Sequence, residues 1–345
     1  MSNASDARSP GARGRSAVPV ARPAIVLVLV GLAMVGIAST AAEPFVRLDS
    51  DAAVSVLTRL AATPMTLSAP DTARPGDLVR VYAAGDGVDA LELVTDAGAL
   101  VLTAPPIRLS MANLVRATAF LVGLDSTLEP GEYALRGIVN GEPELLHALT
   151  VSERSFRSSE FSLTPALTTL RAEPDPEKDR QTRVLTALIL SRDPDAVFHI
   201  GPLHWPLPAT TRRTGLFGDR RIYLYSTGAR ARTVHVGLDL AAPTGTPVHS
   251  SGNGIVRMAE FRIVTGGTVV IEHLPGVFTL YYHLDEVAAN EGAVIAAGDP
   301  IGTVGATGLA TGPHLHWEVR VNGVPISPEE LTERGLLSGI LGTVR

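Results

Sequence analysis

Two short stretches in the C-terminal third of the chain decide its fold: His-Val-Gly-Leu-Asp at residues 235–239 and Gly-Pro-His-Leu-His-Trp-Glu-Val at residues 312–319. Side chains alternate between the two faces of a strand, so each stretch, read as a strand, has one polar and one apolar face. The residues on the polar faces are His235, Gly237 and Asp239 in the first stretch and His314, His316 and Glu318 in the second. We therefore expect neighbouring strands of a β-domain, with these polar groups converging between them.

This convergence suits a zinc ion. Catalytic zinc takes three protein ligands with nitrogen or oxygen donors and keeps a fourth position for water. We predict that His235, Asp239 and His316 hold one Zn²⁺ per chain, with Gly237 leaving room between the first two.

Hydrolysis at such a centre also needs a base. The chain has no His-Glu-x-x-His motif, so the helical zinc-protease arrangement with its internal glutamate is absent. His314, two residues before His316, can supply the base, and His283 in Tyr-Tyr-His-Leu is a second candidate.

Further motifs follow in a fixed order. They are Leu-Ala-Ala-Pro-Thr-Gly-Thr-Pro-Val at 240–248, Tyr-His-Leu at 282–284 and Gly-Thr-Val-Gly-Ala-Thr-Gly at 302–308, preceded by Phe-Gly-Asp-Arg-Arg at 217–221. Together with the two opening stretches, they closely resemble the lysostaphin-like (LytM-type) zinc metalloendopeptidases. The resemblance covers about residues 206–328.

The resemblance implies a compact β-domain with a groove that acts on peptide bonds of peptidoglycan. His235, Asp239 and His316 match the zinc ligands, and His314 and His283 match two catalytic histidines. Zinc would polarise the scissile carbonyl and acidify a water, and a neutral histidine would remove the proton. We assign the base to His314 and oxyanion support to His283, although the two roles can be exchanged.

Three readings of function are open. The first is an exported zinc endopeptidase that hydrolyses stem peptides or cross-links. The second is a non-catalytic wall-binding protein or an activator of other wall hydrolases; the intact ligand set counts against it. The third is an enzyme held latent by its N-terminal half. Arg220 or Arg221 is a candidate for meeting a substrate carboxylate.

The rest of the chain predicts a mostly β protein. Short strands and turns at 65–152 indicate an immunoglobulin-like β-sandwich. We predict a signal segment or membrane anchor at 1–42, a short helical lead at 43–64, a connector at 153–201 with a helix over 175–192, the peptidase domain at 202–330 and a tail at 331–345.

Composition limits the partners and the location. The net charge of −6 gives no basic surface for nucleic acid. The absence of cysteine excludes disulfides and thiolate metal sites. Residues 1–22 are arginine-containing and residues 24–38 almost entirely aliphatic, which is typical of an export signal. The exported remainder would reach the periplasm or cell envelope, and an uncleaved segment would anchor residues 24–42 in the inner membrane.

Overall fold

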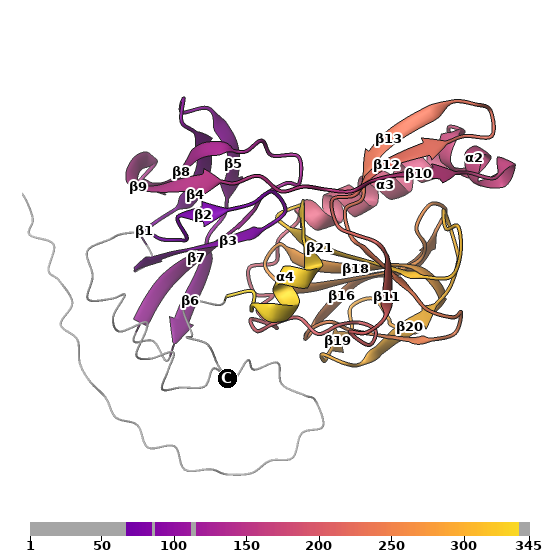
Figure 1. Ribbon diagram of the computed structural model, residues 1–345. Coiled ribbons are helices and arrows are strands. Elements are labelled where there is room, and N and C mark those ends of the chain that lie inside the picture. Colours follow the sequence, from indigo (N-terminus) through magenta and orange to yellow (C-terminus); the bar gives the residue numbers. More distant parts are fainter. Residues whose placement is uncertain (1–66, 85–86, 112–114, 338–345) are drawn as a thin grey trace, which may run out of the picture. The chain divides into compact units, whose positions relative to one another are not determined.

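A computed structural model describes residues 67–84, 87–111 and 115–337 of the 345-residue chain (Figure 1). The predicted signal segment at 1–42 and helical lead at 43–64 lie outside the described residues. The described part is mostly β, which confirms the predicted fold class. None of its helices combines the length and the apolarity that a membrane crossing requires.

Two sheets form the N-terminal β-rich region. The first sheet has the order β1 (Leu67–Ser68), β3 (Leu78–Ala84), β7 (Val115–Gly123), β6 (Ile107–Met111). The second has the order β2 (Thr72–Ala73), β9 (Glu142–Val151), β8 (Gly131–Val139), β4 (Ala90–Thr95), β5 (Leu100–Ala104). Val81 and Phe120 from the first sheet share one buried core with Leu93 and Leu135 from the second. The two sheets therefore pack face to face as a sandwich.

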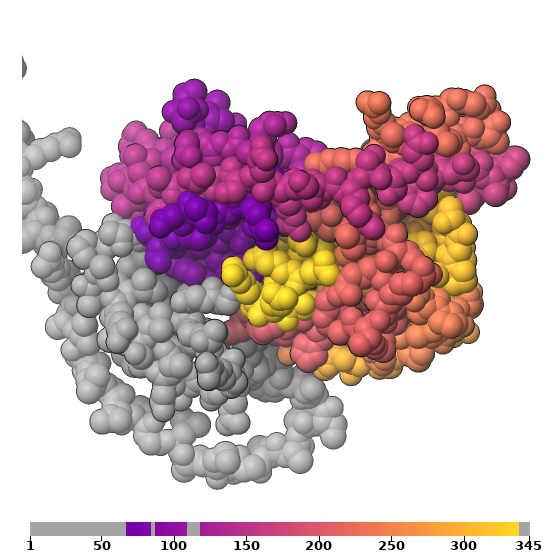
Figure 2. Space-filling view, viewed as in Figure 1, coloured from indigo at the N-terminus to yellow at the C-terminus, as the bar shows by residue number. Residues whose placement is uncertain are grey.

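The other face of the first sheet packs against the C-terminal domain. Leu78 and Leu121 belong to the same buried apolar cluster as Ile326 and Leu336. Arg80, on this face, donates hydrogen bonds to the carbonyl oxygens of residues 335 and 336 and to a carboxylate of α4 (Pro328–Glu333). In Figure 2 the yellow surface around α4 adjoins the indigo surface of the early strands, as these contacts require. Burial at this face joins the two domains.

The connector contains more structure than the sequence predicts. Helix α3 (Pro176–Leu190) agrees closely with the predicted helix over 175–192, and the Asp175 carboxylate caps it by accepting from the Glu177 N–H at 2.8 Å. Strand β10 (Ser158–Ser162) and helix α2 (Pro165–Ala172) were not predicted. Strand β10 pairs in parallel with β12 (Arg220–Leu224), which pairs antiparallel with β13 (Arg230–Val234). The connector thus contributes a strand to a small three-stranded sheet.

The C-terminal domain is built on a larger sheet. Its main path is β11 (Arg212–Gly215), β14 (Leu238–Ala241), β21 (Leu315–Val321), β18 (Val277–Val287), β17 (Gly266–Leu274), β16 (Gly254–Arg262), β19 (Val294–Ile295). Strands β15 (Pro247–His249), β20 (Pro300–Val304) and β22 (Val324–Ile326) pair at its sides. The Asn322–Gly323 turn between β21 and β22 has φ values of 49° and 83°, as a type I′ hairpin turn requires.

Candidate metal centre and active-site groove

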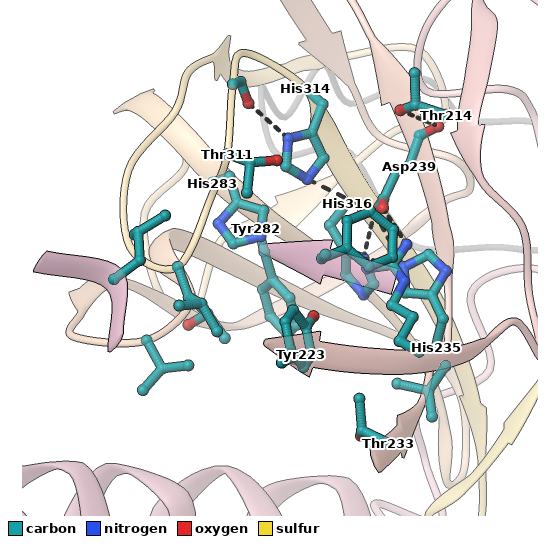
Figure 3. A pocket seen from close by; sticks show the side chains of 18 of the residues that line it. Thr214, Tyr223, Thr233, His235, Asp239, Tyr282, His283, Thr311, His314 and His316 are labelled. Carbon is teal, nitrogen blue, oxygen red and sulfur yellow. Dashed lines mark hydrogen bonds and ion pairs between the residues drawn. The ribbon is translucent and has the colours of Figure 1, made fainter. Parts of the chain in front are cut away.

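The three predicted zinc ligands converge in the structure. Asp239 on β14 and His316 on β21 are direct partners in the strand register. The His316 Nδ1 atom lies 2.8 Å from Asp239 Oδ1, and His235 Nε2 lies 3.0 Å from each of these two atoms (Figure 3). All three side chains are buried. Among the described residues, no fourth histidine or carboxylate joins this group.

His235 reaches this point differently from the prediction. Strand β14 begins only at Leu238, so the predicted strand over 235–239 is wrong for its first three residues. A turn holds His235 instead: its backbone N–H donates to the Asp219 carbonyl at 2.8 Å, and its Nδ1–H donates to the Leu216 carbonyl at 2.8 Å. Because Nδ1 is used as a donor, the lone pair of Nε2 faces the other two ligands.

Gly237 is required where the prediction placed it. A Cβ there would lie 2.5 Å from the carbonyl oxygen of Trp317 and 2.9 Å from Nε2 of His316. Any side chain would therefore push the two ligand-bearing segments apart.

A buried carboxylate fixes the orientation of His316. Its Nε2–H donates to Glu318 Oε1 at 3.0 Å, and Glu318 is in turn paired with Arg320 at 2.6 Å. Burial alone would raise the pKa of Glu318, but the Arg320 and His316 charges outweigh it and lower that pKa to about 2. In the neutral ring that metal binding requires, this bond keeps the remaining proton on Nε2, so Nδ1 can face the metal.

Arg221 holds the third ligand from the opposite side. Its Nη2 lies 2.5 Å from Asp239 Oδ2, which leaves Oδ1 to face the two histidines. The guanidinium also lies over the Phe161 ring of the connector, 5.1 Å from its centroid. Gly215 leaves the space for this pair, because a Cβ there would be 2.1 Å from Arg221 Nη2. The sequence suggested only a substrate contact for Arg221, whereas in the structure Arg221 pairs with the predicted zinc ligand Asp239.

The two candidate catalytic histidines lie beside this centre. The ring centroids of His283 and His314 are 4.8 Å apart, and His314 Nε2 is 3.6 Å from Asp239 Oδ1. Each donates its Nδ1–H to a backbone carbonyl, of Thr307 at 2.7 Å and of Gly312 at 2.8 Å respectively. Burial lowers the pKa of both imidazoles, that of His283 to about 3. Both are therefore neutral at pH 7, with Nε2 free to accept a proton.

The donor set fits a divalent cation. Burial alone would lower the pKa of His316, but Asp239 and Glu318 outweigh it and raise that pKa to about 9. Burial alone would raise the pKa of Asp239, but the imidazoles of His235 and His316 hold that pKa well below its usual value. The centre therefore attracts positive charge, and its two nitrogens and one oxygen are the donors that zinc takes.

The metal centre forms the floor of a groove with a cavity volume of about 540 Å³, within the usual range for ligand sites. One wall comes from the segment 264–265 and the segment 309–314. The other comes from α2 and the three-stranded sheet, through Phe161. Figure 3 shows Tyr223 and Thr233 of the same sheet. The connector thus supplies part of the site.

Comparisons with known proteins agree with this geometry. Residues 233–328, which include all five predicted site residues, match the model of peptidase family M23. This segment of the C-terminal domain is therefore similar to M23 peptidases.

The curated relatives align with this chain over part of their length. The DD-carboxypeptidase/endopeptidase Mpg of Neisseria meningitidis serogroup B is 42% identical over 131 residues, 38% of this chain. The peptidoglycan DD-endopeptidase ShyA of Vibrio cholerae is 37% identical over 123 residues, 36% of this chain. In both cases the alignment spans 28% of the relative's length. A crystal structure of a putative M23 peptidase from Pseudomonas aeruginosa covers 80% of this chain and 98% of its own, at 20% identity and a TM-score of 0.49.

Arg220 and three further histidines lie outside the candidate metal centre. Arg220 donates to the Ser126 carbonyl at 2.7 Å, so the structure gives it a contact with the sandwich. His273 is buried and bonded to the Asn253 carbonyl and the Thr279 hydroxyl, as a structural histidine should be. His204 and His249 line a second, separate cavity.

Proposed function

We propose that this protein is a zinc metalloendopeptidase that hydrolyses peptide bonds of peptidoglycan. The observation that carries the proposal is the convergence of three ligand atoms within 3.0 Å of one another, beside two neutral histidines in the same groove. The names of the related proteins support the substrate class, because ShyA is described as a peptidoglycan DD-endopeptidase and Mpg as a DD-carboxypeptidase/endopeptidase.

In this proposal His235 Nε2, Asp239 Oδ1 and His316 Nδ1 hold one Zn²⁺. When bound, zinc supplies a Lewis acid that polarises the scissile carbonyl and lowers the pKa of a water toward ~7. Arg221 and Glu318 keep two of the ligands in the orientation that this requires.

His314 is the general base. Its Nδ1–H is committed to the Gly312 carbonyl, so Nε2 takes the proton from the attacking water and later returns it to the leaving amine. His283 was predicted to support the oxyanion, but its Nδ1–H is committed to the Thr307 carbonyl, so its neutral ring has no proton on Nε2 to donate. We therefore give His283 the exchanged role, as the second residue able to accept the proton of the attacking water. The backbone of His283 has a φ of 63°, a costly conformation for a non-glycine residue, which we attribute to this placement.

Peptidoglycan lies outside the inner membrane, so we place the protein in the cell envelope. The arginine-containing and then aliphatic pattern of residues 1–42 is the sequence feature that would direct its export.

The test separates metal binding from chemistry. We expect about one zinc per chain by elemental analysis, and its loss in His235→Ala, Asp239→Ala and His316→Ala. His314→Ala and His283→Ala should retain zinc but lose hydrolysis of purified peptidoglycan, by about 10²–10⁴-fold for the base. A zinc-free wild type, or full activity in His314→Ala, would refute the assignment.

A further inference from the structure

The wall of the groove formed by the connector lies outside residues 233–328, the part that matches the M23 family. Helix α2 is tied to the β12–β13 hairpin: the Leu163 N–H donates to the Leu224 carbonyl at 2.9 Å, and the Ser226 N–H donates to the Thr168 hydroxyl at 3.0 Å. The wall is therefore a fixed structure, and side chains that it presents to the groove are held in place.

Arg171, in the last turn of α2, is one of these side chains. Its Nε donates to the Tyr225 hydroxyl at 3.2 Å, and its guanidinium lies 4.2 Å from the centroid of the Tyr223 ring. These two contacts orient the guanidinium without neutralising it. Within the described residues, neither Nη atom of Arg171 has a hydrogen-bond partner, and no carboxylate pairs with it.

Arg212, at the start of β11, lines the same groove from another side. It is exposed, and no described residue forms a hydrogen bond or ion pair with its side chain. Arg213, its neighbour, points to the other face of the strand and pairs with Glu329 at 2.7 Å. The alternation therefore leaves one of the two arginines free for the groove.

The remaining charges in the groove are already matched. Arg221 is paired with Asp239, and Glu318 is paired with Arg320. Arg171 and Arg212 thus add two unbalanced positive charges to the groove. A groove of this charge favours a substrate with a carboxylate.

We propose that Arg171 and Arg212 bind a free carboxylate of the peptide substrate and so determine which peptides are hydrolysed. The planar guanidinium matches a carboxylate through two parallel N–H bonds, and the two tyrosines beneath Arg171 pre-organise it for this contact. The inference rests on the proposed function and assigns a specificity site to the same groove.

The experiment uses the full protein and one pair of probes: soluble cross-linked peptides released from peptidoglycan, with their carboxylates free or converted to primary amides. Binding is measured by calorimetry, and hydrolysis as kcat/KM, for the wild type, Arg171→Gln, Arg212→Gln and the double variant. Arg232→Gln is the matched control, because Arg232 is exposed on β13 of the same sheet and does not line the groove. Zinc content is measured for every variant.

We expect the wild type to prefer the free acid. Each groove variant should lower the acid-to-amide ratio in both assays by about tenfold, the double variant should bring it near one, and Arg232→Gln should leave it unchanged. Arg171→Lys should recover part of the preference. Equal use of acid and amide by the wild type, a ratio unaltered in both groove variants, or an equal fall in Arg232→Gln would overturn the proposal. If binding shows the preference but neither probe is hydrolysed, the carboxylate site stands and the proposed peptidase function fails.

Discussion

Replacing Glu318 with Gln tests whether a residue outside the predicted ligand set controls metal binding. Glu318 accepts the Nε2–H of His316 at 3.0 Å in a buried environment, and in the neutral ring that binds zinc this bond keeps the proton on Nε2, away from Nδ1. Glutamine has nearly the same shape, so the packing is retained while the negative charge is removed. Its amide group can also donate, which stabilises the tautomer with the proton on Nδ1. The variant should therefore bind zinc more weakly.

The size of the effect follows from the bond that is lost. A hydrogen bond to a charged group contributes about 1.5–3 kcal/mol, and about 1.4 kcal/mol corresponds to a tenfold change in affinity. We therefore expect zinc affinity to fall about 10- to 100-fold. This agrees with the typical effect of removing the carboxylate behind a metal-binding histidine.

The assay is competition for zinc against a chromogenic chelator at one fixed pH, with urea unfolding to follow the free energy of unfolding. Glu272→Gln is the matched control: Glu272 is equally buried and also pairs with an arginine, Arg257, but contacts no predicted ligand. An affinity of Glu318→Gln within about twofold of the wild type would refute the reasoning, because the bond to His316 would then contribute nothing. An equal loss in Glu272→Gln would show that the fold, rather than the ligand orientation, had changed.

Three further predictions test other parts of the structure. Because the pKa of His316 is raised to about 9 and a histidine ligand of zinc must be neutral, zinc binding at pH 7 should release about one proton. The apparent zinc affinity should therefore rise roughly tenfold per pH unit up to pH ~9. Calorimetry in buffers of different ionisation enthalpy measures the proton release, and its absence would contradict the prediction. Gly237→Ala should reduce zinc affinity at least about tenfold in the chelator assay, because its Cβ would lie 2.5 Å from the Trp317 carbonyl oxygen; wild-type affinity would contradict the required close approach. Glu330→Gln should destabilise the protein by about 3 kcal/mol in urea unfolding, since it leaves the buried Arg80 guanidinium without its anionic partner; an unchanged unfolding midpoint would mean that the contact does not stabilise the joined domains.

Most of the candidate metal centre could be predicted from local sequence patterns. Asp239 and His316 fall in strands whose alternation is visible in the sequence, and the two strands pair in the register that places these side chains opposite one another. The orientation of His235 could not be predicted in the same way. It depends on a turn at 216–219, whose carbonyl groups accept from His235, and this is a contact between segments rather than a periodic pattern.

The connector shows what local patterns miss. Strand β10 has the sequence Ser-Ser-Glu-Phe-Ser, which carries no apolar alternation strong enough to predict a strand. It exists because its backbone pairs with β12, about sixty residues later in the chain, in the register that joins Phe161 to Tyr223. The role of Arg221 was missed for the same reason: only the folded chain brings it to Asp239 and beneath Phe161.

The groove combines residues from inside and outside the segment that matches the M23 family. The residues that we propose for zinc binding and proton transfer all lie within 233–328, whereas Phe161, Arg171 and Arg212 lie before that segment. Substitutions in the earlier segments can therefore change the charge and shape of the groove without touching a metal ligand. Arg221 is the exception, because it is held by the connector and itself holds Asp239. Through this one side chain, the packing of the connector bears directly on the geometry of the metal centre.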